Sequence, residues 1–266
     1  MDRKPIVTAN CWSGLRRHTD ARIGLGRSGV SQPTRPQLAF QLAHARARDA
    51  VHVPLDLEQL ERALAGAGLR SLRLHSQAAD RATYLQRPDL GRRLDPDSAA
   101  LLKQWQRQEA AADATIVIAD GLSSTAVQRH AVAVAQAVDR CLAREGLTRS
   151  PICIVQQGRV AVGDEVGELL GSRAVILLVG ERPGLSSPDS LGIYYTWNPR
   201  VGLTDAARNC ISNIRPAGIS PTEAAERLLW LLKESRRLGL SGVALKDRSG
   251  EGEALAGTGA RNFLLE

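Results

Sequence analysis

Short apolar runs mark the second half of the chain. Each is rich in β-branched residues and is bounded by polar or glycine-containing segments, which is typical of buried strands. The four runs lie at 114–120, 151–157, 174–180 and 191–197. A further run at 241–245, "SGVAL", predicts a last strand.

Helical patterns separate these runs. A shorter helix is predicted near 163–170, and a long one follows "GLSST" (121–125). The apolar face of the long helix consists of Val127, Ala131, Val134, Val138 and Cys141 or Leu142. Strands that alternate with helices are typical of a parallel sheet covered on both faces. We therefore predict an α/β fold with a Rossmann-like parallel sheet and helices on both faces.

One more helix carries signals at both of its ends. Ser220 is its expected N-cap, Pro221 takes the first position and Glu223 completes a capping box. Gly239 is expected to end this helix, because glycine adopts the left-handed conformation that follows many helices.

The first part of the chain shows helical patterns without strands. Thr34 and Gln37 form a capping box in front of a helix that continues to Val51. One face of that helix carries Phe40, His44, Ala47 and Val51. Further helical patterns occupy 56–66 and the region around 97–111.

These patterns divide the chain into four segments. The segments are an irregular N-terminal arm at 1–33, a helical basic segment at 34–112, a Rossmann-like domain at 113–246 and a flexible tail at 247–266.

A parallel sheet predicts where a ligand binds. Ligands of such sheets bind outside the carboxyl ends of the strands, so the loops there are expected to form one rim. The four loops are 119–124, 156–164, 178–185 and 209–215.

Composition excludes several classes of protein. The apolar runs are too short to span a bilayer and the first residues lack a signal-peptide pattern, so we expect a cytoplasmic protein without a membrane partner. The four cysteines (Cys11, Cys141, Cys153 and Cys210) are widely spaced and indicate neither a disulfide framework nor a zinc site.

Positive charge is concentrated in the first part of the chain. The first 110 residues hold 18 Lys and Arg against 11 Asp and Glu, whereas the rest of the chain holds 17 of each. A basic segment suits nucleic acid or a protein interface. The arginines are dispersed and aromatic residues make up only 3%, so we expect no nucleic-acid partner.

The stretch "GLGRSG" (24–29) fits the G-x-G-x-x-G pattern of dinucleotide-binding loops. That pattern must follow a buried strand and open a helix, yet charged residues precede Gly24 and prolines follow Gly29. An NAD-dependent oxidoreductase and a basic protein- or nucleic-acid-binding module remain the alternative functions.

Several uncommon strings occur together between about residues 20 and 246. They are "RIGLGR" (22–27), "PTRPQLAFQLAHARARDAVH" (33–52), "LVGERPGL" (178–185) and "NCISNIRPAGISPTEAA" (209–225). In this order they resemble the small (light) subunit of ethanolamine ammonia-lyase.

The resemblance implies an adenosylcobalamin-dependent lyase that converts ethanolamine to acetaldehyde and ammonia. It also implies a large subunit, a TIM barrel that holds the substrate, with the cofactor between the two subunits. The positions that match the family's cobalamin contacts are Val160, Glu181 and Cys210, all in the predicted rim loops. We expect no catalytic acid, base or nucleophile in this chain.

The resemblance also bears on the metal and on location. None of the five histidines lies in an Asp-x-His-x-x-Gly motif, so we expect this chain to provide no ligand to cobalt. Some family members carry an N-terminal extension that targets them to bacterial microcompartments, and residues 1–18 do not clearly match one, which leaves both locations open.

With the dinucleotide interpretation weakened, "GLGRSG" is a glycine-rich turn around Arg27 in the basic part of the chain. We predict that it is a docking loop for the large subunit, where glycines allow close backbone approach.

Overall fold

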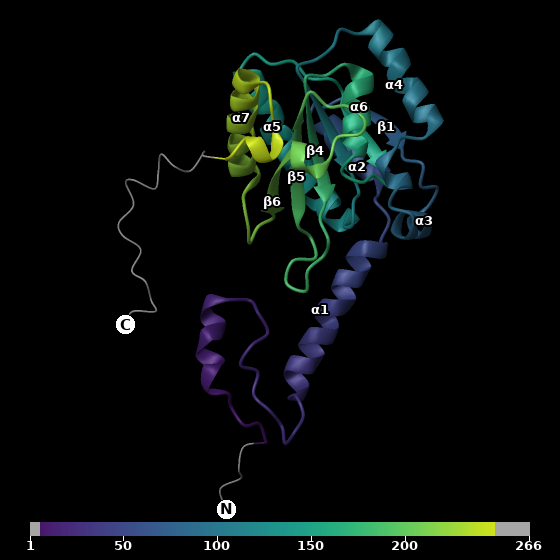
Figure 1. Cartoon of the computed structure of the whole chain (residues 1–266). Helices are drawn as coiled ribbons and strands as arrows, with labels where there is room; N and C mark the ends of the chain where they lie inside the picture. Colours follow the sequence, from purple (N-terminus) through teal and green to yellow (C-terminus); the bar gives the residue numbers. More distant parts are fainter. Residues whose placement is uncertain (1–5, 248–266) are drawn as a thin grey trace, which may run out of the picture.

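A six-stranded sheet forms the centre of the computed structural model, which describes residues 6–247 (Figure 1). The strands follow one another across the sheet in the order β1-β3-β2-β4-β5-β6. Their bounds are Ser71–His75 (β1), Ala114–Ala119 (β2), Ile152–Gln156 (β3), Ala174–Gly180 (β4), Leu191–Trp197 (β5) and Arg208–Ile214 (β6). The four apolar runs between 114 and 197 are thus confirmed as strands.

The sheet is mixed, so the prediction of a parallel Rossmann-like sheet is wrong in this respect. Strands β1, β3, β2 and β4 pair with one another in parallel. Strand β5, in contrast, pairs antiparallel with both β4 and β6. The physical reason is the connection between β4 and β5, residues 181–190, which contains no helix. A parallel crossover requires about a dozen residues or more, whereas an antiparallel return does not.

Two further segments differ from expectation near the end of the chain. Residues 209–215, expected as a loop, lie almost wholly in β6, where only three positions are buried. The run 241–245, expected as a strand, instead contains the 3-10 helix Gly242–Ala244. An edge strand needs few buried side chains, so β6 carries a weak apolar signal.

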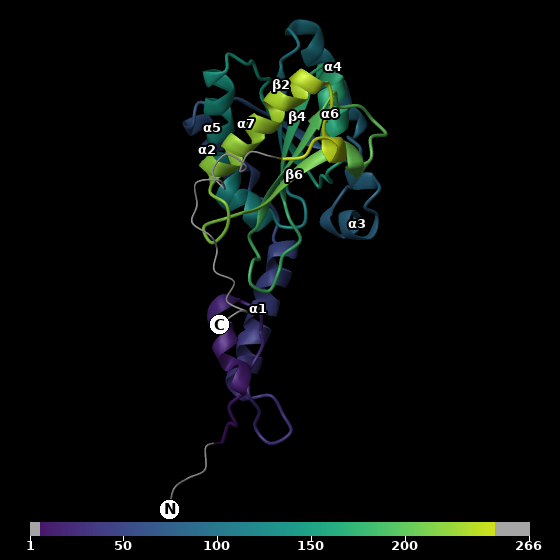
Figure 2. The ribbon, with the colours of Figure 1, turned by 60° about the vertical axis from the view of Figure 1, so that its left-hand side comes forward.

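Helices cover both faces of the sheet, as predicted (Figure 2). Helices α2, α5 and α7 pack on one face, and α4 and α6 pack on the other. Their bounds are Leu57–Gly66 (α2), Arg81–Gln86 (α3), Pro96–Gln108 (α4), Ser124–Arg144 (α5), Val162–Leu170 (α6) and Pro221–Leu238 (α7). The predicted apolar face of α5 is buried. The Ser220 side chain caps α7 by accepting a hydrogen bond from the Glu223 amide, and the left-handed Gly239 ends it.

The two helical layers explain the continuous apolar runs. In β2, Ile116 and Ile118 face the α5 side, whereas Val117 and Ala119 face the α6 side. Both faces of the strand are therefore buried, as expected for strands between helical layers. Strand β1 lies at the edge and buries only Leu74 completely, which is why the prediction of helices alone in 34–112 missed it.

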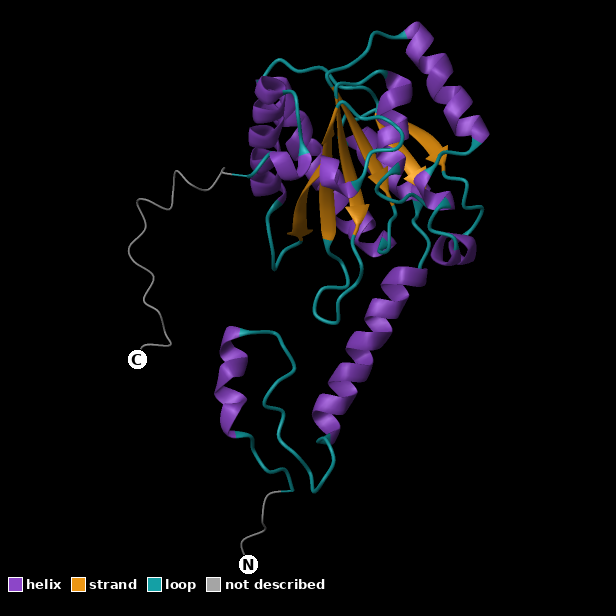
Figure 3. Cartoon of the chain, viewed as in Figure 1, coloured by secondary structure: helices purple, strands orange, loops and turns teal. Residues whose placement is uncertain are grey.

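The chain before residue 53 stands away from the sheet (Figures 1 and 3). It consists of the 3-10 helix η1 (Cys11–His18), an extended return and the helix α1 (Thr34–His52). The predicted helix is confirmed, but its cap is not: Pro33 is the N-cap and makes no side-chain hydrogen bond. Only Ala50 of α1 is buried; on the predicted apolar face Ala47 and Val51 are half-buried near α5, whereas Phe40 and His44 are exposed.

Among residues 6–247, no helix is both long and apolar enough to cross a membrane. Residues 1–5 of the predicted arm, and the predicted tail beyond Asp247, lie outside the described residues.

Candidate functional site

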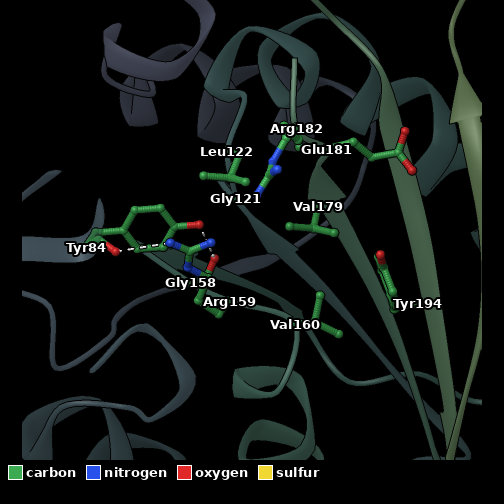
Figure 4. Close-up of a pocket in the computed structure, with 11 residues that line it drawn as sticks. Tyr84, Gly121, Leu122, Gly158, Arg159, Val160, Val179, Glu181, Arg182 and Tyr194 are labelled. Carbon is green, nitrogen blue, oxygen red and sulfur yellow. Dashed lines mark hydrogen bonds between the residues drawn. The ribbon is translucent and has the colours of Figure 1, made fainter. Parts of the chain in front are cut away.

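A pocket of about 250 Å³ opens at the carboxyl ends of the parallel strands (Figure 4). The loops after β2, β3 and β4 meet there, which confirms their predicted convergence. The lining residues come from these loops, from α3 and from β5. They are Tyr84, Gly121, Leu122, Gly158, Arg159, Val160, Val179, Gly180, Glu181, Arg182 and Tyr194.

Glycines let the loops approach one another closely. Gly121 has a φ of +58°, and a Cβ there would overlap the carbonyl oxygen of Gly180. The neighbouring Leu122 amide donates a hydrogen bond to that same carbonyl at 2.9 Å. After β3, a Cβ on Gly158 would lie 2.9 Å from the Cβ of Ala119. Side chains at these positions would push the strand ends apart and reshape the pocket.

Tyr84 forms one wall of the pocket and is packed against two guanidinium groups. The Cζ atoms of Arg81 and Arg159 lie 4.7 and 4.2 Å from its ring centroid. Its hydroxyl donates to the carbonyl oxygen of Gly158 at 3.3 Å. Burial raises the pKa of Tyr84 to about 12, so the phenol is neutral and acts as a fixed wall rather than as an acid or base.

Arg81 also ties the strand ends to α1. It donates to the carbonyl oxygens of Val51 at 2.7 Å and Gly121 at 2.8 Å. Asp120 lies 3.8 Å from the same guanidinium and accepts a hydrogen bond from the Gly158 amide at 3.1 Å. Burial raises the pKa of Asp120, an effect that the positive charge of Arg81 opposes. This cluster fixes the backbone beneath the pocket.

Val160 lies on the floor of the pocket, between Arg159 and Tyr194 in Figure 4. It is half-buried, at the start of the turn that leads into α6. An isopropyl group in this position offers an apolar surface to a ligand.

Glu181 follows β4, and its carboxylate is held by β6 and by the residue before β5. It accepts hydrogen bonds from the hydroxyls of Ser190 and Ser212, the latter at 2.5 Å, and from the Asn213 amide at 3.3 Å. In Figure 4 the carboxylate points away from Tyr84 and Arg159. Glu181 therefore lines the pocket mainly with its stem, while its charge anchors the β4 end.

Cys210 is placed differently from the other two predicted residues. It lies within β6 rather than in a loop, directly across from Tyr194 on β5, and it does not line the pocket. Although Cys210 is exposed, partial desolvation of its thiol, and to a smaller extent the negative charge of Glu181, raise the pKa of the thiol. The structure thus brings Val160 and Glu181 together in one pocket and places Cys210 outside it, beside Tyr194 on the neighbouring strand.

Arg182 was missed by the sequence analysis. Its exposed side chain points into the pocket, and it has no hydrogen-bond or ion-pair partner among residues 6–247 (Figure 4). A cation free of protein partners beside apolar groups is suited to bind an anionic or carbonyl oxygen of a ligand.

The sequence held a signal for some of the missed residues. Gly121, Gly158 and Gly180 each lie at or just after the end of a predicted strand, where close backbone approach is expected. Tyr84 carried no such signal, because its helix α3 reaches the pocket only through the tertiary fold.

The G-x-G-x-x-G loop has neither flanking element of a dinucleotide site. Between residues 6 and 23 no strand precedes Gly24, and α1 begins only after Pro33. A Cβ on Gly24 would lie 2.9 Å from the Cα of Ser13, and one on Gly26 would lie 2.7 Å from the Thr8 carbonyl oxygen. These glycines serve contacts within the N-terminal arm.

Comparison with known proteins identifies relatives along nearly the whole chain. Residues 9–246 match the family model of the ethanolamine ammonia-lyase light chain (EutC). The ethanolamine ammonia-lyase small subunit of Azotobacter vinelandii is 57% identical over 99% of this chain and 98% of the relative. That of Ralstonia nicotianae is 56% identical over 100% of this chain and 98% of the relative.

Proposed function

Because this chain belongs to the ethanolamine ammonia-lyase light-chain family, we propose that its strand-end pocket binds adenosylcobalamin against the large subunit. The observation that carries the proposal is the position of Val160 and Glu181 in one pocket at the carboxyl ends of the parallel strands. In this proposal the enzyme deaminates ethanolamine to acetaldehyde and ammonia.

The residues present fit the chemistry of a cobalamin. The corrin ring has broad apolar faces and a periphery of neutral amides, and its nucleotide loop carries a phosphate. Val160, Val179 and Leu122 supply apolar contacts, and Arg182 supplies a cation without a protein partner in the described chain. The close approach of the glycine backbones leaves the pocket open to a flat group.

This chain's part in the reaction is binding and shielding. When bound, the cofactor supplies radical chemistry through homolysis of its cobalt–carbon bond. Val160 would contact an apolar part of the cofactor and Arg182 would donate hydrogen bonds to one of its oxygens, while Glu181 holds the ends of β4 and β6 together around the site. The walls formed by Tyr84 and Tyr194 exclude water, which protects reactive species from side reactions.

The size of the pocket supports a shared site. Its volume of about 250 Å³ lies below the roughly 300–1,000 Å³ of sites that enclose a drug-sized ligand. A cobalamin is larger than such a ligand and can place only one edge in this pocket. The rest of the cofactor requires a second surface, which we assign to the large subunit.

Equilibrium binding tests the proposal. The co-purified large and small subunits are titrated with adenosylcobalamin and, separately, with NADH, and free ligand is measured by equilibrium dialysis and visible absorbance. We expect saturable binding of cobalamin and none of NADH. Binding of NADH by this chain, or no cobalamin binding by the pair, would refute the proposal.

A further inference from the structure

We propose that the N-terminal arm (residues 6–33) together with α1 is the surface that docks on the large subunit. This inference rests on the proposed function in that it takes the large subunit as the partner that covers the strand-end pocket. Large apolar side chains are exposed mainly here: ten of the fourteen in the described chain lie between residues 6 and 53. The ten are Ile6, Val7, Trp12, Leu15, Ile23, Val30, Leu38, Phe40, Leu42 and Val53.

The first half of helix α1 lacks the tertiary packing that stabilises most helices in water. Leu38 and Leu42, one helical turn apart, are 59% and 52% exposed, and of the whole helix only Ala50 is buried. Most helices in proteins depend on tertiary packing of an apolar face. The described residues provide no such packing for the first half of α1, so a partner must cover it.

The arm presents a preformed surface rather than an extended tail. Thr8 and Arg27 exchange backbone hydrogen bonds of 2.8 and 3.0 Å, which pair the two sides of the arm. Gly24 and Gly26 allow the return segment to lie close against η1 and Thr8. Trp12, which is 65% exposed, projects from this folded unit. Its large apolar surface is characteristic of interface anchors.

The arm and the pocket lie at the same edge of the sheet. The end of α1 is fixed there, because Arg81 binds the Val51 carbonyl and the Ser124 hydroxyl donates to the Val53 carbonyl. The Arg22 guanidinium also donates to the Leu185 carbonyl at 3.3 Å, in the loop that begins with Glu181. A subunit that covers the pocket therefore also lies beside α1.

Charge favours a different protein over a second copy of this chain. Residues 6–53 carry seven arginines and only two acidic residues, Asp20 and Asp49. Two such surfaces repel each other, whereas an acidic surface on another protein attracts this one. The charge disfavours a second copy, and the position of the arm beside the pocket assigns the large subunit as the occupant.

The test compares two double variants in the assembly with the large subunit. Leu38→Asp with Leu42→Asp alters the exposed face of α1. Val201→Asp with Leu238→Asp is the matched control, because these residues are 42% and 43% exposed and lie in the sheet domain. We expect the arm variant to weaken subunit association at least about tenfold and the control to change it less than about twofold, by analytical ultracentrifugation.

A second variant guards against loss of helix α1. Arg17→Glu with Arg27→Glu changes the charge of the arm and leaves the sequence of α1 intact. This double variant is expected to weaken association more at low salt than at high salt. Far-UV circular dichroism checks that each variant is folded. Equal association of all variants would overturn the proposal. So would a concentration-dependent dimer of this chain alone that the Leu38 and Leu42 changes abolish.

Failure of this inference is distinguishable from failure of the proposed function. A wild-type pair that assembles but does not bind adenosylcobalamin refutes the cofactor proposal. The docking surface is then still tested by the association measurements on the variants. Conversely, a pair that binds cobalamin and assembles normally with the arm variants refutes only the docking surface.

Discussion

The Glu181 carboxylate accepts a hydrogen bond from the Ser212 hydroxyl at 2.5 Å and thereby joins the end of β4 to the edge strand β6. The strand between them, β5, contributes Tyr194 to the pocket, and Cys210 lies directly across from Tyr194 on β6. The contact therefore fixes Glu181 against the same strand, β6, that carries Cys210 two residues before Ser212. It gives Glu181 a positioning role besides any direct contact with a ligand.

Glu181→Ala is expected to weaken adenosylcobalamin binding by the assembled pair about tenfold, with subunit association unchanged. The buried Ser190 hydroxyl loses its acceptor, which costs about 1–3 kcal/mol for a buried donor left without a partner, whereas the exposed Ser212 hydroxyl can bond to water and releases its hold on the end of β4. Equilibrium dialysis measures the affinity.

Ser212→Ala separates the two roles of Glu181. If the carboxylate acts by holding β6, this variant weakens cobalamin binding in the same direction by a smaller factor. If Glu181 acts only by direct contact, Ser212→Ala leaves the affinity unchanged. Unchanged affinity in Glu181→Ala itself would count against both roles.

Gly121→Ala is expected to abolish the pocket geometry, whereas Gly146→Ala is not. Both glycines have a positive φ, of +58° and +66°, so both substitutions carry a similar backbone cost of about 1 kcal/mol. Only the Cβ at Gly121 meets the Gly180 carbonyl, and nothing lies within 4 Å of one at Gly146. We expect Gly121→Ala to lose cobalamin binding and to unfold at lower urea concentration than Gly146→Ala. Equal unfolding midpoints would show that the strand ends relax without cost.

Arg27→Ala is expected to weaken association with the large subunit, because Arg27 lies in the arm that we assign to the interface. Arg140→Ala is the control, since Arg140 is an exposed arginine near the far end of α5. Neither change is expected to create or remove nucleotide binding. If Arg27→Ala assembles as well as the control, the glycine-rich loop is merely a turn.

Acid is expected to remove a stabilising contribution of Asp113. Hydrogen bonds from Thr148, led by its backbone amide at 2.9 Å, lower the pKa of Asp113. A carboxylate with a lowered pKa in the folded state stabilises fully above its unfolded pKa of about 3.9 and loses this effect as pH falls through the folded value. Asp113→Asn is therefore expected to cost about 1–3 kcal/mol at pH 7.

Urea unfolding between pH 7 and pH 3 checks this expectation. The difference in unfolding free energy between the wild type and Asp113→Asn should be constant down to about pH 5 and should shrink below about pH 4. A difference that stays constant to pH 3 would show that the Asp113 pKa is not lowered on folding.

Most of the secondary structure could be predicted, because local signals determine it. The apolar runs of β2 to β5 are buried in strands, and the Ser220 and Gly239 signals match the ends of α7. Strands β1 and β6 were missed because edge strands bury few side chains. Strand direction was also missed, since it depends on how the 181–190 connection returns rather than on any periodicity.

The candidate site was predictable in its place and only partly in its residues. Loops at strand ends are visible in the sequence, and so are the glycines that bring them together. Tyr84 and Arg182 depend on geometry: α3 packs against the β3 loop, and the β4 end directs Arg182 inward.

The sequence by itself determined the helices apart from α3, four strands, the family and the concentration of positive charge in the first part of the chain. Only the tertiary structure decided that the sheet is mixed, that Cys210 lies beside Tyr194 and outside the pocket, and that the basic arm stands beside the pocket. The physical reason is the distance along the chain over which each interaction acts. Caps, periodicity and charge act over a few residues, whereas strand direction, the contact between Glu181 and Ser212 and the exposure of α1 arise when distant segments pack.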